Sequence, residues 1–169
     1  MTIIGYNFVN NNKNNIDLII NGKSYALNQY ANLKKGENTI KLIIKNELTD
    51  LSWMFRGLNY NIKNIELKNL DVSKVKSFMG MFYDCSWLSN LNGLLKWNIS
   101  KGRNFSHLFS GCSSLSNING LKNWNVSNGA NFSSMLYDCA SLSDIKSLQN
   151  WNILNGKDLC LEIIYYYLI

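Results

Sequence analysis

Residues 97–112, WNISKGRNFSHLFSGC, return 27 positions later as residues 124–139, WNVSNGANFSSMLYDC. Agreement at so many positions on one period indicates a tandem repeat. A unit of this size cannot bury its apolar face alone, so we expect four units to stack around one continuous core. The same interval separates other positions too: Met54-Phe55, Met81-Phe82, Leu108-Phe109 and Met135-Leu136, and then Cys85, Cys112 and Cys139.

Each unit reads as two short elements joined by turns. Residues 104–109 carry apolar side chains at helical spacing, which predicts a short helix. Residues 114–119 predict a short strand, and Asn119-Gly120 predicts the turn that follows it. These elements predict an α/β solenoid of leucine-rich-repeat-like units, with parallel short strands on one side and short helices on the other.

The first 50 residues do not follow the period. Residues 16–27 read as a β-hairpin around Asn21-Gly22, and residues 38–44 as a further strand. We therefore predict an N-terminal β-rich cap over residues 1–50 and tandem repeats over residues 51–158. Residues 159–169 are predicted to be either an apolar tail or a truncated fifth repeat.

The net charge of +6 is spread along the chain. Its densest places are Lys74 with Lys76 and Lys101 with Arg103, which are sparse for a nucleic-acid footprint. Nucleic acid is therefore an unlikely partner by sequence, and the charge reads mainly as a solvated surface. The N-terminus lacks the pattern of a signal peptide, and residues 159–169 are too short to span a bilayer. As written, the sequence predicts a soluble chain with no export signal.

Residues 124–129, WNVSNG, and residues 135–142, MLYDCASL, resemble the BspA-like leucine-rich repeat surface proteins. The resemblance covers roughly residues 51–156 and is specific to a repeat class. It implies a right-handed leucine-rich solenoid at the surface of anaerobic microbes or protists, with adhesion or protein binding as its role. It implies no catalytic residues, and it suggests a cell-surface location that the missing export signal does not support.

The chemical motifs favour structure over catalysis. The cysteines recur once per unit rather than in the close pairs of a zinc site, which predicts a ladder of buried thiols, with Cys160 outside it. His107 is expected to face solvent, and no nucleophile motif accompanies it. We therefore predict a protein that is not an enzyme and has no cofactor or metal. The asparagines of the repeated Trp-Asn pairs predict hydrogen-bonded turns, and the tryptophans predict core packing: Asn98, Asn125 and Asn152, with Trp97, Trp124 and Trp151.

The remaining function is binding. We predict a non-catalytic binding or adhesion module that recognises a protein or a glycan through one exposed face of the repeats. Two alternatives stay open: a basic repeat that binds nucleic acid, and a structural or degenerate fragment of an array with no ligand. The candidate partner-binding residues are Ser89, Asn90, Asn92, Ser116, Asn117, Asn119, Ser143, Asp144 and Lys146, with Trp53 and Trp87 as exposed anchors.

Overall fold

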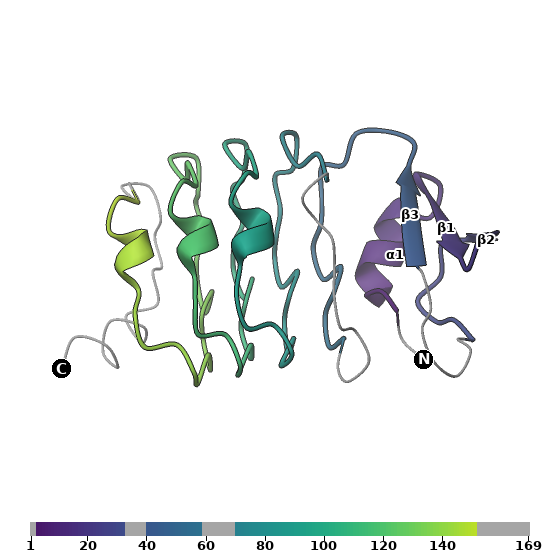
Figure 1. Ribbon diagram of the computed structural model, residues 1–169. Coiled ribbons are helices and arrows are strands. Elements are labelled where there is room, and N and C mark those ends of the chain that lie inside the picture. Colours follow the sequence, from purple (N-terminus) through teal and green to yellow (C-terminus); the bar gives the residue numbers. More distant parts are fainter. Residues whose placement is uncertain (1–2, 33–39, 59–69, 152–169) are drawn as a thin grey trace.

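A small β-sheet and one α-helix precede a stack of turn-rich units (Figure 1). The structure, a computed structural model, describes residues 3–32, 40–58 and 70–151. In chain order the elements are α1 (Tyr6–Asn12), β1 (Ile16–Ile20), β2 (Lys23–Ala26), β3 (Ile40–Ile44) and three 3-10 helices, η1 (Asn92–Leu94), η2 (Asn119–Leu121) and η3 (Lys146–Leu148).

The sheet has the strand order β2-β1-β3, and both pairings are antiparallel. The hairpin expected from the sequence joins β1 to β2, and Asn21 and Gly22 at its turn both have positive φ. Alternate residues of β1 are buried, so one face of the sheet contributes to the core. Helix α1 was not anticipated; its Phe8 is fully buried.

Successive 27-residue units lie side by side along the stack (Figure 1). Alternate backbone N–H groups donate to the next unit: Phe78 to Asn104, Gly80 to Ser106 and Phe82 to Leu108, at 2.8–2.9 Å. The N–H groups between them bond within their own unit, as Met81 does to Phe78 at 3.1 Å. In this segment, half of the backbone N–H groups therefore bond within their own unit, and the other half bond to the neighbouring unit.

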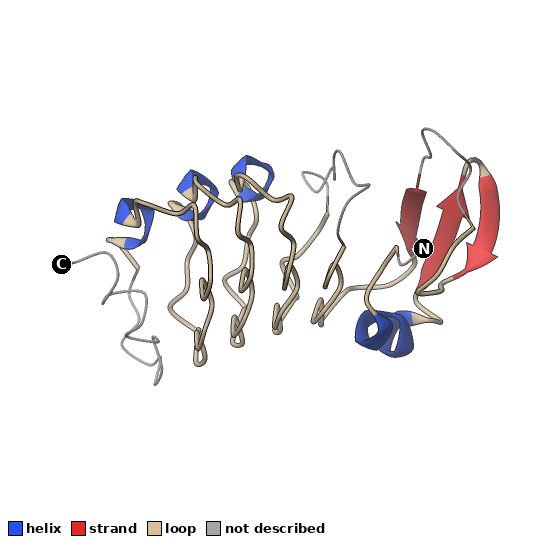
Figure 2. Cartoon of the chain, turned by 90° about the horizontal axis from the view of Figure 1, so that it is seen from below, coloured by secondary structure: helices blue, strands red, loops and turns tan. Residues whose placement is uncertain are grey.

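The predicted right-handed, leucine-rich-repeat-like α/β solenoid is wrong. Within the described ranges, the chain has one three-stranded antiparallel sheet, one α-helix and little helix overall, and its units contain turns, 3-10 helices and isolated parallel bridges (Figure 2). Residues 104–109 form turns because a segment this short cannot repay helix nucleation. His107 has a φ of 55°, which no right-handed helix contains.

The core consists of columns in which the same aromatic position repeats. Phe78 stacks on Phe105 with ring centroids 5.4 Å apart, and Phe105 stacks on Phe132 at 5.1 Å. Trp97, Trp124 and Trp151 form a second column at 6.4 and 6.3 Å, which confirms that the tryptophans pack. A repeat therefore places each apolar residue against its own counterpart.

The N-terminal segment joins the first unit by a close backbone approach. The Gly5 N–H donates to the Met54 carbonyl at 2.8 Å, and a Cβ at Gly5 would overlap the Trp53 carbonyl oxygen. Only glycine fits this contact. The proposed domain boundaries after residues 50 and 158 stay predictions, and residues 159–169 lie outside the described ranges.

Candidate functional site

Nine of the candidate residues form one exposed surface, which we call the polar face. One turn, repeated in three units, holds it in register. The side-chain oxygens of Asn90, Asn117 and Asp144 accept the backbone N–H two residues ahead, at 3.2, 2.9 and 2.7 Å, just where the 3-10 helices begin. The members of the polar face are Ser89, Asn90, Asn92, Ser116, Asn117, Asn119, Ser143, Asp144 and Lys146.

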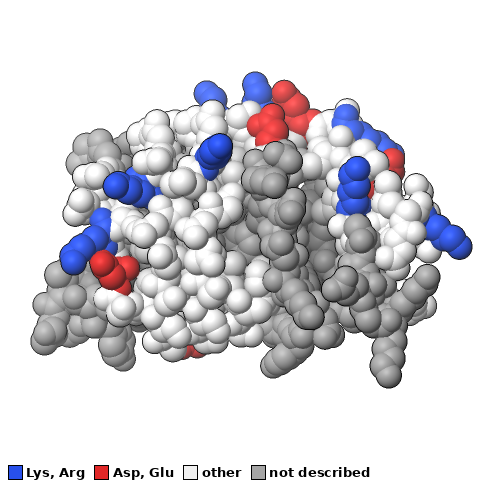
Figure 3. Space-filling view, viewed as in Figure 1, with Lys and Arg blue, Asp and Glu red and all other residues white. Residues whose placement is uncertain are grey.

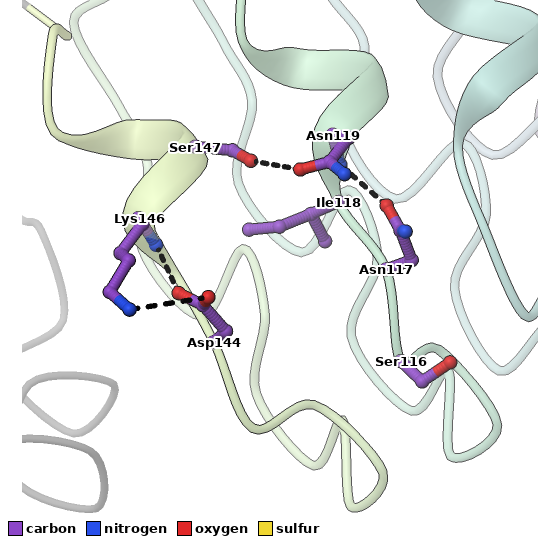
Figure 4. A pocket seen from close by; sticks show the side chains of 7 residues that line it. All are labelled: Ser116, Asn117, Ile118, Asn119, Asp144, Lys146 and Ser147. Atoms are coloured by element: carbon purple, nitrogen blue, oxygen red, sulfur yellow. Dashed lines mark hydrogen bonds and ion pairs between the residues drawn. The ribbon is translucent and has the colours of Figure 1, made fainter.

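A cavity of about 220 Å³ opens on the polar face between two neighbouring units (Figure 4). Ser147 donates its hydroxyl to Asn119 Oδ1 at 2.8 Å across the two units, and Lys146 Nζ lies 3.8 Å from Asp144 Oδ2. Neutral and charged side chains, which include both hydrogen-bond donors and acceptors, line this cavity. Such a lining suits a ligand rich in hydroxyl or amide groups. Its lining residues are Ser116, Asn117, Ile118, Asn119, Asp144, Lys146 and Ser147.

The two tryptophans predicted as exposed anchors are each only partly exposed. Trp87 packs against the hydrophobic core, and its Nε1 is buried without a hydrogen-bond partner among the described residues. The Trp53 ring packs on Gly80 of the next unit, so closely that a Cβ at Gly80 would overlap it. Both tryptophans were expected to be exposed because neither has an aromatic counterpart in the other units. Trp53 nevertheless packs on Gly80, and Trp87 packs on the core.

A second cluster surrounds Trp53. The guanidinium carbon of Arg56 lies 5.1 Å from the Trp53 ring centroid and 5.3 Å from that of Tyr83. The Trp53 and Tyr83 rings meet edge to face at 5.7 Å, and Tyr83 meets His107 at 6.2 Å. His107 was expected to face solvent and is instead half-buried. Sequence reasoning missed this cluster because its members come from three units.

The three repeat cysteines are buried free thiols, which confirms the predicted ladder. The Sγ atoms of Cys85, Cys112 and Cys139 donate to carbonyls 30 residues earlier at 3.0, 3.2 and 3.2 Å. Burial raises the pKa of Cys85 and of Cys139 to about 12, and it raises the pKa of Cys112 as well. Thiols held this firmly protonated are poor nucleophiles. Cys160 lies outside the described residues.

The predicted asparagine turns are present where the structure describes them. Asn98 and Asn125 accept the backbone N–H of Ser100 and Ser127 at 3.2 and 3.1 Å. Asn152 lies outside the described residues.

Cations that are distant in sequence become neighbours through stacking. The Arg103 N–H donates to the Lys76 carbonyl at 2.8 Å, so these two exposed residues lie on adjacent units. On the face that Figure 3 shows, Lys and Arg side chains are spread over the described surface and do not gather into one large patch. The 27-residue interval was the signal that could have predicted this pairing.

The described residues also lack two features that would bear on function. No helix among them is long and apolar enough to cross a membrane. In the same ranges, no three His, Cys, Asp or Glu side chains gather where they could hold a metal ion.

Comparison with known proteins gives one match. The family described as "Mycoplasma protein of unknown function, DUF285" matches residues 49–161, which include every unit of the stack. No curated protein and no solved structure matches the chain.

Proposed function

The chain belongs to the DUF285 family, and on that premise we propose that it is a non-catalytic binding module whose polar face recognises a protein or a glycan. One observation carries the proposal: all nine residues of the polar face are exposed at corresponding positions of three units. Their turns are already hydrogen-bonded, so a ligand would bind a preorganised surface at a low cost in conformational entropy.

The chemistry of the cavity supports a ligand rich in hydroxyl or amide groups. Asn119 and Ser147 supply an amide and a hydroxyl, and Asp144 and Lys146 supply one charge of each sign. Glycans and exposed peptide backbones both offer donors and acceptors of this kind. The resemblance to BspA-like surface proteins supports adhesion at a cell surface as the setting, which is part of the proposal.

The test compares two triple variants on a glycan array and on a panel of purified immobilised proteins. Asn92→Arg, Ser116→Arg and Ser143→Arg add bulk and charge to the polar face in three units. The matched control adds the same charge at other exposed positions: Asn123→Arg, Ala130→Arg and Asn150→Arg. Circular dichroism establishes that both variants fold.

We expect the wild type and the control to bind the same ligand and the polar-face variant to lose at least tenfold in affinity. A ligand that the polar-face variant binds as tightly as the wild type would reject the polar face as the site. A ligand lost equally by both variants would indicate sensitivity to net charge alone.

A further inference from the structure

The backbone of Trp53 is strained in a way that its neighbours explain. Trp53 has a φ of 62°, in the left-handed region that bulky residues rarely adopt. The next unit has Gly80 at the corresponding position, and there the Trp53 ring takes the space that a side chain would need. The positive φ recurs at Gly80, His107 and Ser134, so it belongs to the turn that the units share, and the packing of the ring on Gly80 holds it at Trp53.

The strained tryptophan holds a cation in place. The Arg56 guanidinium lies over both the Trp53 and Tyr83 rings, at 5.1 and 5.3 Å. Arg56 is exposed, and none of the described carboxylates forms an ion pair with it. A cation–π contact restrains the guanidinium and leaves its N–H groups available to donate, so a planar oxyanion can bind with both oxygens.

We propose that Arg56, restrained by cation–π contacts with the Trp53 and Tyr83 rings, is an anchor for a carboxylate on an acidic segment of a protein partner. Trp, Tyr and Arg are the residue types that contribute most to protein interfaces. The net charge of +6 attracts an acidic partner and favours its approach. The inference rests on the proposed function, since it names the chemistry of one partner class for a second surface of the same stack.

The probe is a fluorescently labelled hexaglutamate peptide with blocked termini, followed by fluorescence anisotropy at low ionic strength. Arg56→Lys keeps the charge and removes the planar fork. Trp53→Gly removes the stacking ring and relieves the positive φ. Two variants serve as controls: Ser134→Gly makes the same backbone change at the corresponding position of a later unit, and Lys101→Gln removes an exposed charge elsewhere.

We expect the wild type, Ser134→Gly and Lys101→Gln to bind hexaglutamate alike, and Arg56→Lys and Trp53→Gly to bind at least tenfold more weakly. Unchanged binding by Arg56→Lys would overturn the proposal, because charge alone would then suffice. An equal loss in Lys101→Gln would overturn it for the same reason. If Trp53→Gly fails to fold, Arg56→Lys alone decides.

Two outcomes separate this inference from the proposed function. A wild type that ignores hexaglutamate while the polar-face variant loses its own ligand would overturn the carboxylate anchor and leave the polar face intact. Tighter binding of a hexagalacturonate than of hexaglutamate would overturn the assignment to a protein partner, since the carboxylate would then be carried by a glycan.

Discussion

Trp124 donates its indole N–H to the backbone carbonyl of Leu94, 30 residues earlier, at 3.2 Å. Trp151 makes the same bond to Leu121 at 3.2 Å. A single side chain thus packs in the tryptophan column and also satisfies a carbonyl of the preceding unit. The stack is held by contacts of this type, which pair each unit with its neighbour.

Replacing Trp124 tests both roles of this side chain. Trp124→Ala should lower the free energy of unfolding by about 3–5 kcal/mol, because it empties a buried position between stacked rings. Trp124→Phe keeps a ring and removes the indole N–H bond, while the Leu94 carbonyl still accepts the Trp97 N–H at 3.0 Å, so it should cost about 0.5–1.5 kcal/mol. Urea denaturation measures both values. Equal costs for the two variants would contradict the contribution of the packed ring.

Glycine is required at one of two corresponding positions. A Cβ at Gly120 would overlap the Leu91 carbonyl, whereas a Cβ at Gly93 would meet nothing within 4 Å. Gly120→Ala should therefore destabilise the fold by about 1–3 kcal/mol. Gly93→Ala should stabilise it by about 0.4–1 kcal/mol, because it restricts the unfolded chain. Thermal unfolding of the two variants should shift in opposite directions; a shared direction would count against the close approach at Gly120.

A backbone position with positive φ lies directly before each repeat cysteine, and a glycine there should stabilise the fold. Asp138 has a φ of 57°, and Gly111 holds the corresponding place with a φ of 74°. Asp138→Gly should raise the free energy of unfolding by about 1 kcal/mol, since a non-glycine residue is strained there. Gly111→Asp, the reverse change, should destabilise, because its Cβ would also overlap the Asp84 side chain. Chemical denaturation measures both, and a stable Gly111→Asp would contradict the prediction.

The thiol ladder predicts a loss of stability at high pH. Burial raises the folded-state pKa of Cys85 and Cys139 from 9.0 to about 12, so between these values the unfolded chain binds fewer protons than the folded one. The contribution of these two thiols to the free energy of unfolding is therefore fully present below pH 9. It falls as the pH rises toward 12, by up to about 1.4 kcal/mol per pH unit for each cysteine. Urea titrations from pH 8 to 10.5 measure the slope.

Cys85→Ala is the control for the pH dependence, in a Cys160→Ser background that leaves only ladder thiols. It should lower stability at pH 8 and make the decline above pH 9 shallower than in the parent. An identical decline in the two proteins would show that the ladder thiols do not cause it.

The sequence predicted the contacts of the core better than the shape of its elements. The 27-residue interval placed Trp124 against Trp97 and Cys112 near Cys85, because a fixed period brings equal positions together in any stack. It did not reveal that residues 104–109 would form turns. Their apolar spacing fits a helix, but cross-unit bonds from alternate N–H groups compete with helical bonds, and tertiary context overrides such a weak local preference.

The candidate site also contains residues that the sequence identified and residues that only the structure brought together. Asn90, Asn117 and Asp144 were identifiable because each recurs with the repeat and carries its own turn chemistry. The cluster of Trp53, Arg56, Tyr83 and His107 was not, since it combines unlike residues from two repeat positions and only the stacking of three units brings them together. The contacts of residues that do not recur with the repeat can be identified only from the stacked structure.

The sequence by itself determined the repeat, the unit length, the N-terminal hairpin and the burial of the repeated cysteines and of Trp97 and Trp124, because periodicity and turn chemistry can be read from the chain itself. Only the tertiary structure decided that the described units would form turns and 3-10 helices rather than α-helices and strands, and that Arg56 would contact two aromatic rings. Both results depend on which backbone and side-chain groups a neighbouring unit offers, and that follows from contacts 27 residues apart rather than from any short segment.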